Sequence, residues 1–208
     1  MRDTPQDYGW PWPTVGCPWS ARRENRCLRV LRELLPALPR RHVAVDADEV
    51  DVHLNPRIGL DWMEYGEQKE MLTPGQNEKR YLAGALNAVT GELTWVPGGR
   101  KTSLLFIAVL HRLLTVCPDA PVIHVILDTY HIHTSRITQR ALAALDGRIV
   151  LHFLPAYCPN ENRVERLWRD LHAAVTRNQR CPTMWELMQH VYRYWQRQAL
   201  RRAQRPAP

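Results

Sequence analysis

Three acidic residues have types and spacing that suit chemistry on phosphate esters: Asp48, Asp128 and Glu165. Carboxylate oxygens are hard ligands that suit Mg²⁺ or Mn²⁺, and no matching set of histidines and cysteines accompanies them. Two such ions about 4 Å apart activate a weak nucleophile and stabilise the leaving oxygen during in-line attack on phosphorus. The three residues therefore predict a two-metal site for phosphodiester cleavage, provided that the fold brings them together.

Two buried strands are expected to position the aspartates. The run 122–127 is almost entirely apolar, which is typical of a strand covered on both faces of a parallel sheet. Asp128 follows at its carboxyl end, where open α/β sheets place reactive groups. In the stretch 42–54, the alternation of side chains puts Asp46 and Asp48 on one face. Two acids there are costly unless they bind a cation or a partner, so Asp46 competes with Asp48 as the first metal ligand.

A helix is expected to carry Glu165. The chain between Asp128 and Glu165 is long enough for one helix, a return strand and the start of a second helix. This return would bring the second carboxylate back towards the first. The apolar stripe of that second helix leaves Glu165 at its edge, and consists of Val164, Leu167, Trp168, Leu171 and Val175.

The whole pattern predicts an α/β fold with a mixed sheet. We expect strands at 42–54, 80–88, 92–96, 122–127 and 148–153, and helices at 21–35, 103–116, 135–145, 161–177 and 183–200. Three antiparallel strands followed by right-handed crossovers form a mixed five-stranded sheet flanked by helices. This is the ribonuclease H-like, or retroviral-integrase-like, arrangement.

At 208 residues the chain suits one domain with short appendages. We expect an irregular arm and a basic helix at 1–41, the catalytic domain at 42–180, and a C-terminal helix with a basic tail at 181–208. No apolar run is long enough to span a membrane, and the first residues lack the apolar core of a signal peptide. The five cysteines are widely spaced, so we expect free thiols in a reducing cytoplasm.

The net charge of +7 favours a polyanionic partner, because arginines are concentrated at 22–41 and 193–205, on either side of an acidic centre. A solvated helix face is about as good an explanation of the first cluster. If the partner is DNA, the arginines nearest to the acids should contribute a positive rim, together with the 193–205 cluster. These candidate DNA-binding residues are Arg136, Arg140, Arg163, Arg166 and Arg169.

Each candidate also has a simpler interpretation. Asp128 alone is more often a turn or helix cap than a ligand, and Glu165 alone could pair with a nearby arginine on the surface. His131 and His133 invite a zinc site, but no third soft ligand lies nearby. Cys158 is better explained as a buried thiol than as a nucleophile, because no base accompanies it. The spacing of the three acids and their expected positions in the sheet together favour a functional role for all three.

Three separated segments occur in a familiar order: Asp48-Glu49 at the end of an apolar strand, Val125-Ile-Leu-Asp-Thr-Tyr-His-Ile-His133, and Leu154-Pro-Ala-Tyr-Cys-Pro-Asn-Glu-Asn-Arg-Val-Glu-Arg-Leu-Trp168. Over roughly residues 42–180 they resemble the catalytic domain of mariner-like DDE transposases, especially the bacterial insertion-sequence branch. The resemblance implies that Asp48, Asp128 and Glu165 bind two Mg²⁺ or Mn²⁺ ions. They match the Asp of an Asp-Glu pair, the Asp of a Leu-Asp-Asn-x-x-x-His segment and the acid of a Pro-x-x-Asn-x-x-Glu-x-x-Trp segment.

The sequence departs from the family pattern in two places within the motifs. Thr129 replaces the usual Asn, and Arg163 stands where the family often has Pro; neither change removes a ligand. A larger departure is at the N-terminus, where forty residues with one expected helix cannot hold the family's paired helix-turn-helix modules. We therefore expect the catalytic half of a split or truncated transposase.

The resemblance implies cleavage and transfer of DNA strands at transposon ends by a bacterial cytoplasmic, nucleoid-associated protein. Double-stranded DNA is the expected partner, with a homodimer and a separate upstream helix-turn-helix polypeptide as further candidates. Two rivals remain open from the sequence. One is another ribonuclease H-like nuclease, such as a junction resolvase, since this fold supports many activities. The other is an inactive DNA-binding remnant.

Overall fold

The computed structural model describes residues 37–59, 62, 64–66, 70, 73–87, 89–154 and 162–203. The strands are β1 (Val43–His53), β2 (Lys79–Asn87), β3 (Leu93–Gly98), β4 (Ile123–Leu127) and β5 (Ile149–Phe153). The helices are α2 (Ser103–Val116), α3 (His131–Thr134), α4 (Arg136–Ala143), α5 (Val164–Leu171), the π-helical turn η3 (His172–Thr176) and α6 (Met184–Ala203). The expected basic helix at 21–35 and Cys158 lie outside the described residues.

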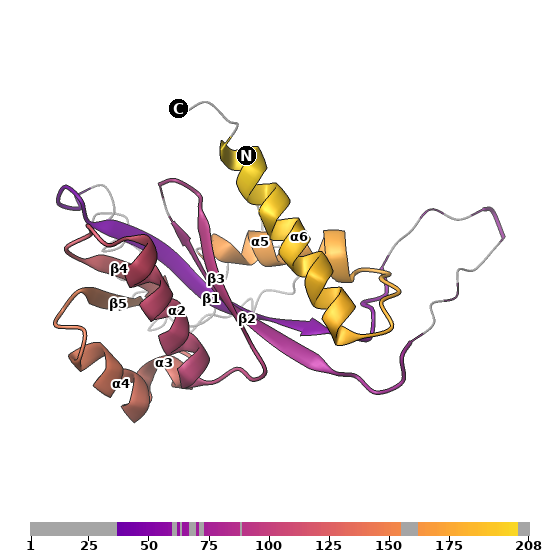
Figure 1. Ribbon diagram of the computed structural model, residues 1–208, viewed down its shortest axis with the longest axis horizontal. Helices are drawn as coiled ribbons and strands as arrows, with labels where there is room; N and C mark the ends of the chain where they lie inside the picture. The colour runs from indigo at the N-terminus through magenta and orange to yellow at the C-terminus, as the bar shows by residue number, and fades with distance from the viewer. Residues whose placement is uncertain are drawn as a thin grey trace, which may run out of the picture.

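The five strands form one mixed sheet in the order β3-β2-β1-β4-β5, so β1 is central. β1 pairs with β2, and β2 with β3, in antiparallel fashion, whereas β4 is parallel to both β1 and β5 (Figure 1). This arrangement confirms the mixed sheet predicted from the sequence. The carboxyl end of β4 therefore lies beside the middle of β1, where Asp48 is found.

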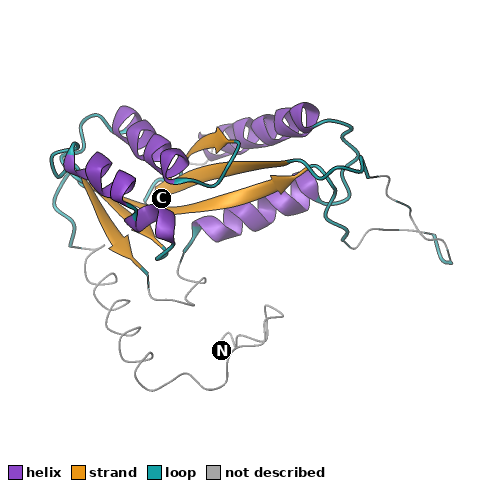
Figure 2. Ribbon diagram, turned by 90° about the horizontal axis from the view of Figure 1, so that it is seen from below, coloured by secondary structure: helices purple, strands orange, loops and turns teal. Residues whose placement is uncertain are grey.

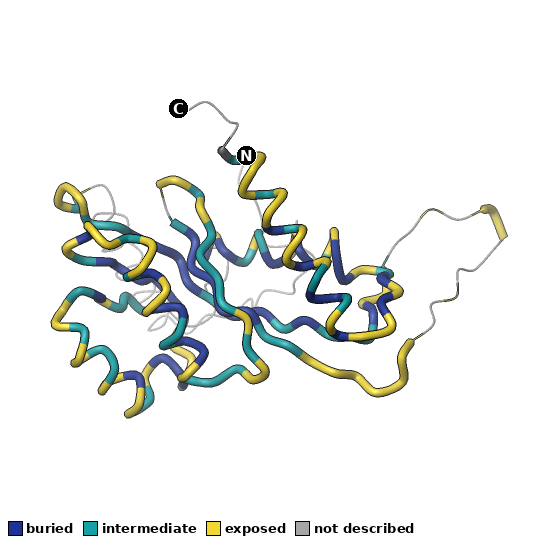
Figure 3. Tube along the Cα trace, in the orientation of Figure 1, coloured by how far each residue is buried: buried dark blue, intermediate teal, exposed yellow. Residues whose placement is uncertain are grey.

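A hydrophobic core lies on each face of the sheet. β1 contributes Val45 and Ala47 to the core under α2, and Val50 and Val52 to the core under α5 and α6. The sheet consequently runs between helices on both sides (Figure 2), and its buried strands form the dark interior of the molecule in Figure 3. Asp46 and Asp48 share the face of Val50, as the alternation in β1 predicted.

Local signals explain most helix boundaries. The side chain of Thr102 accepts a hydrogen bond from the backbone N–H of Leu105 and so caps α2, and Ser135 caps α4 in the same way. The buried stripe of α2 includes Phe106 and Leu110, whereas Arg112 is exposed. The short helix α3 had no counterpart among the predicted elements.

The predicted helix at 161–177 is two elements. α5 begins at Val164 and ends at Leu171, and the chain continues as η3, in which the N–H of Arg177 bonds to the carbonyl of His172. No described helix is long and apolar enough to cross a membrane. Cys117 and Cys181 are free thiols, as expected, and the other three cysteines lie outside the described residues.

Candidate active site

Asp48 lies at the centre of the sheet and is held by a tryptophan. The indole Nε1 of Trp168 donates a hydrogen bond to Asp48 Oδ2 at 3.1 Å. Gly84 pairs with Asp48 across the β1–β2 ladder, and a Cβ at Gly84 would come within 2.5 Å of the Trp168 ring. Burial, followed by the charge of Glu49, raises the pKa of Asp48 to about 7. The site therefore favours a cation beside this carboxylate.

Two residues that flank Glu165 fasten α5 to β1. Asn162 is buried, and its side-chain amide donates to the carbonyl of Ala47 at 3.0 Å while its Oδ1 accepts from the N–H of Val164 at 3.2 Å. Trp168 provides the second attachment through Asp48. Glu165 lies on the helix between these attachments and is half-buried. Burial raises its pKa, and the charge of Asp128 raises it further against the opposing effect of Arg169.

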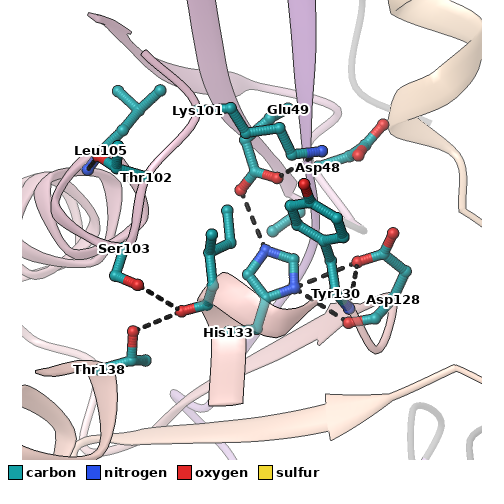
Figure 4. A network of polar contacts seen from close by, with 12 residues as sticks. Asp48, Glu49, Lys101, Thr102, Ser103, Leu105, Asp128, Tyr130, His133 and Thr138 are labelled. Atoms are coloured by element: carbon teal, nitrogen blue, oxygen red, sulfur yellow. Dashed lines mark hydrogen bonds and ion pairs between the residues drawn. The ribbon is translucent and has the colours of Figure 1, made fainter. Parts of the chain in front are cut away.

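Asp128 follows β4 and is oriented by a buried histidine (Figure 4). His133 Nδ1 lies 3.0 Å from the Asp128 carbonyl oxygen and 3.1 Å from its Oδ1, and His133 Nε2 lies 3.1 Å from Glu49 Oε1. Burial alone would lower the pKa of His133, but the hydrogen bonds with Asp128 and Glu49 raise it to about 9. Both ring nitrogens therefore donate, and the hydrogen bond from His133 lowers the pKa of Asp128.

Lys101, which immediately precedes the N-cap residue of α2, completes this network. Its Nζ lies 3.3 Å from Glu49 Oε2 and 4.4 Å from the centre of the Tyr130 ring. Glu49 thus has a cation at each oxygen and is almost fully buried, which leaves it poorly placed to bind a metal ion. The backbone N–H of Tyr130 also donates to Asp128 Oδ1 at 3.2 Å.

Asp46, the rival candidate for the first ligand, has a different partner. Its buried carboxylate accepts a hydrogen bond from Arg163 Nε at 2.6 Å. Burial raises its pKa in spite of that arginine. Asp48, by contrast, is close enough to Asp128 for the charge of Asp128 to raise its pKa. This geometry favours Asp48 over Asp46 as the partner of Asp128.

The structure thus places Asp48 and Glu165 each within electrostatic range of Asp128. Within the described residues, no three His, Cys, Asp or Glu side chains are close enough together to hold one metal ion. The donor set nevertheless fits a hard divalent cation, because a buried carboxylate with a raised pKa faces a second carboxylate that is 56% exposed.

Sequence reasoning missed the supporting residues. Lys101 carried no pattern of its own, and its partner Glu49 lies far from it in the chain. His133 was weighed only as a zinc ligand, although it occupies the His position of the second motif. Asn162 and Trp168 were visible as motif positions, and the structure shows what each of them binds.

The structure places the candidate DNA-binding arginines on the protein surface. Arg136 and Arg140 lie on α4, Arg163 precedes α5, and Arg166 and Arg169 lie on α5; all five are exposed. A separate groove of about 700 Å³ runs between α6 and η3. Its cationic side chains are Arg193, Arg197 and Arg201, and Asp170 also lines it.

Comparison with known proteins gives this arrangement a family context. Residues 44–188 match the family model described as DDE superfamily endonuclease. The chain is 42% identical over 190 residues to the insertion element IS630 uncharacterized 39 kDa protein of Shigella sonnei, an alignment that covers 86% of this chain and 54% of that protein. The chain therefore spans about half the length of the curated relative that it matches.

Solved structures share the fold at low sequence identity. The Mos1 transposase paired-end complex with left transposon end matches with a TM-score of 0.66 and 16% identity, over 95% of this chain and 58% of that one. The Mos1 mariner paired end complex with Mn matches with a TM-score of 0.65 and 15% identity, over 89% and 57%. These likenesses confirm the ribonuclease H-like fold.

Proposed function

The chain belongs to the DDE superfamily of endonucleases, and on that premise we propose that it is the catalytic domain of an insertion-sequence transposase, which cleaves and transfers DNA strands at the ends of its element. The observation that carries the proposal is that Asp48 on β1 and Glu165 on α5 each lie within electrostatic range of Asp128, and that Asn162 fastens the start of α5 to β1. The sequence similarity to an insertion-element protein supports the biological setting.

We propose Asp48, Asp128 and Glu165 as the ligands of two divalent cations, Mg²⁺ or Mn²⁺. Bound there, the cations would activate the attacking oxygen and stabilise the leaving oxygen at phosphorus. The remaining work falls to the chain itself. His133 fixes the orientation of Asp128, and Trp168 fixes that of Asp48. Each carboxylate is therefore held in one orientation before a cation binds.

Double-stranded DNA is the proposed substrate. Arg136, Arg140, Arg166 and Arg169 are exposed and suit contact with phosphate oxygens. Arg163 is a proposed contact too, although its guanidinium also balances Asp46. The basic groove along α6 extends the positive surface away from the acids. A homodimer and a separate helix-turn-helix polypeptide that reads the element ends are proposed partners.

We propose an arm and basic helix at 1–41, the catalytic domain at 42–180 and a C-terminal helix with a basic tail at 181–208.

The packing of α6 supports the candidate site. Trp195 of α6 lies edge-on to Trp168 at 5.9 Å between ring centres, in the core that also contains α5. α6 therefore supports the residue that holds Asp48.

The test is strand nicking by the purified 208-residue chain. Duplexes carrying the element ends, scrambled duplexes and four-way junctions are compared with Mn²⁺, with Mg²⁺ and with EDTA. We expect slow nicking of duplex DNA that requires the metal and is lost in Asp128→Asn but kept in the exposed control Asp119→Asn. Preference for junctions would favour a resolvase, and nicking that survives EDTA or Asp128→Asn would contradict the proposal.

The same chain should bind element ends and scrambled duplex with similar affinity, because its proposed contacts are to phosphates rather than to bases. A gel-shift competition measures this directly. A preference for the ends of more than about tenfold, roughly 1.4 kcal/mol, would show that the chain itself reads the ends and would remove the need for a separate reading partner.

A further inference from the structure

Lys101 is a cation placed among the candidate metal ligands, and no motif accounts for it. Its ammonium group reaches from the start of α2 over the ring of Tyr130 and towards Asp48 (Figure 4). The Lys101 side chain is 27% exposed, whereas the side chain of its ion-pair partner Glu49 is 2% exposed. The lysine is therefore buried enough to be held in place and open enough to meet a substrate.

The contacts of Lys101 leave part of its hydrogen-bonding capacity unused. An ammonium group has three N–H donors. Among the described residues, the ammonium group forms an ion pair with Glu49 Oε2 at 3.3 Å, and the centre of the Tyr130 ring lies 4.4 Å from it. Glu49 keeps this geometry fixed, because His133 binds its other oxygen. The lysine is thus held by the Glu49 carboxylate and the Tyr130 ring.

The charge of Lys101 acts on both aspartates of the site. In the metal-free protein it offsets the repulsion between Asp48 and Asp128. Divalent cations at these carboxylates would replace that favourable interaction with repulsion between like charges. An anion next to Lys101 would then restore the balance, and the proposed reaction supplies one in the DNA phosphate.

We propose that Lys101 is a phosphate-binding residue of this site: its ammonium group balances Asp48 and Asp128 while they are metal-free, and binds a phosphate oxygen of the DNA once cations occupy them. The inference rests on the proposed function and adds a substrate contact to it. The proposal requires that the charge of Lys101 weakens metal binding in the absence of DNA. In the presence of metal ions, the same charge should strengthen DNA binding.

Lys101→Gln separates these two effects. Mn²⁺ affinity without DNA, measured by electron paramagnetic resonance titration, should increase at least threefold, because a neighbouring positive charge has been removed. DNA affinity, measured by fluorescence anisotropy on a short duplex, should change less than twofold in EDTA. With Ca²⁺ present, it should fall at least fivefold relative to the unmodified chain. A purely structural role would weaken metal binding and DNA binding together.

Two matched variants complete the experiment. Arg100→Gln removes one positive charge from the neighbouring exposed position and should leave Mn²⁺ affinity within twofold. Lys101→Arg retains the charge and should retain both affinities, which keeps the test decisive if Lys101→Gln folds poorly. Equal weakening of metal and DNA binding in Lys101→Gln, or no change in either, overturns the role of Lys101 alone. Failure of the unmodified chain to bind Mn²⁺ or DNA overturns the proposed function as well.

Discussion

The indole of Trp168 donates a hydrogen bond to Asp48 at 3.1 Å while its ring rests on the backbone at Gly84, the residue paired with Asp48 across the sheet. A helix residue thus orients a strand carboxylate through a space that only glycine leaves open. Because Trp168 follows Glu165 by one turn of α5, the same contact also fixes the position of Glu165 relative to Asp48.

Gly84→Ala should displace the Trp168 ring, since a Cβ would lie 2.5–2.7 Å from two of its atoms. We expect a loss of about 1–3 kcal/mol in the free energy of unfolding from this overpacking. Metal-dependent nicking should fall further than stability alone explains. Urea unfolding and nicking rates measure the two effects. Gly99→Ala is the control, because nothing lies within 4 Å of its added Cβ; equal behaviour of both variants would contradict this role for Gly84.

His133→Gln should destabilise the protein by about 3 kcal/mol or more, because it removes one of the two cations that balance the buried Glu49. Thermal unfolding of the metal-free protein measures the loss. His131→Gln, at an exposed position on the same short helix, should have little effect. A His133→Gln variant as stable as the unmodified chain would show that Glu49 does not depend on the imidazolium.

The fold was predictable, and the three acids could be selected as candidates, because their signals are local. A buried strand that ends in Asp128 and an apolar stripe beside Glu165 can each be recognised within a few neighbouring residues. The strand order then followed from the succession of elements, since antiparallel neighbours and right-handed crossovers leave few alternatives. The observation that favours Asp48 over Asp46 is not local, because Arg163 approaches Asp46 from another element.

The supporting network could not be predicted for the same reason. His133 and Glu49 are 84 positions apart, and Lys101 meets Glu49 only through the packing of α2 against the sheet. The π-helical turn η3 was also missed, because the apolar spacing through Val175 suits a continuous α-helix. Its shift in hydrogen bonding appears only in backbone contacts such as that between His172 and Arg177.

His172 should make stability depend on pH. Burial lowers the pKa of His172 to about 4 in the folded protein. In the unfolded chain the same imidazole is protonated below about pH 6.5, so protonation between these two values favours unfolding. Its contribution is therefore present above pH 6.5 and is lost as the pH falls towards 4. Comparison of His172→Gln with the unmodified chain by urea unfolding should show a difference that changes by about 2 kcal/mol over this range. A difference independent of pH would contradict this prediction.

DNA binding should weaken steeply with salt, because phosphate contacts release counterions. The double variant Arg136→Gln and Arg140→Gln should lower the slope of log affinity against log salt by about 1–2. Anisotropy titrations across salt concentrations provide the slopes. Arg41→Gln is the control, since Arg41 lies before β1, beside Asp119 and away from the carboxyl end of β4. An unchanged slope in the double variant would show that Arg136 and Arg140 are solvated and do not contact DNA phosphates.

Anomalous scattering from a crystal of the chain soaked in Mn²⁺ tests the proposed site most directly. We predict Mn²⁺ peaks between β1, the end of β4 and the first turn of α5, spanned by oxygens of Asp48, Asp128 and Glu165 at about 2.0–2.2 Å, close to the distances of small hard cations. Asp46 should remain on Arg163. Peaks coordinated by Asp46 or Glu49 instead of Asp48, or a lack of Mn²⁺ at Asp128, would contradict the assignment.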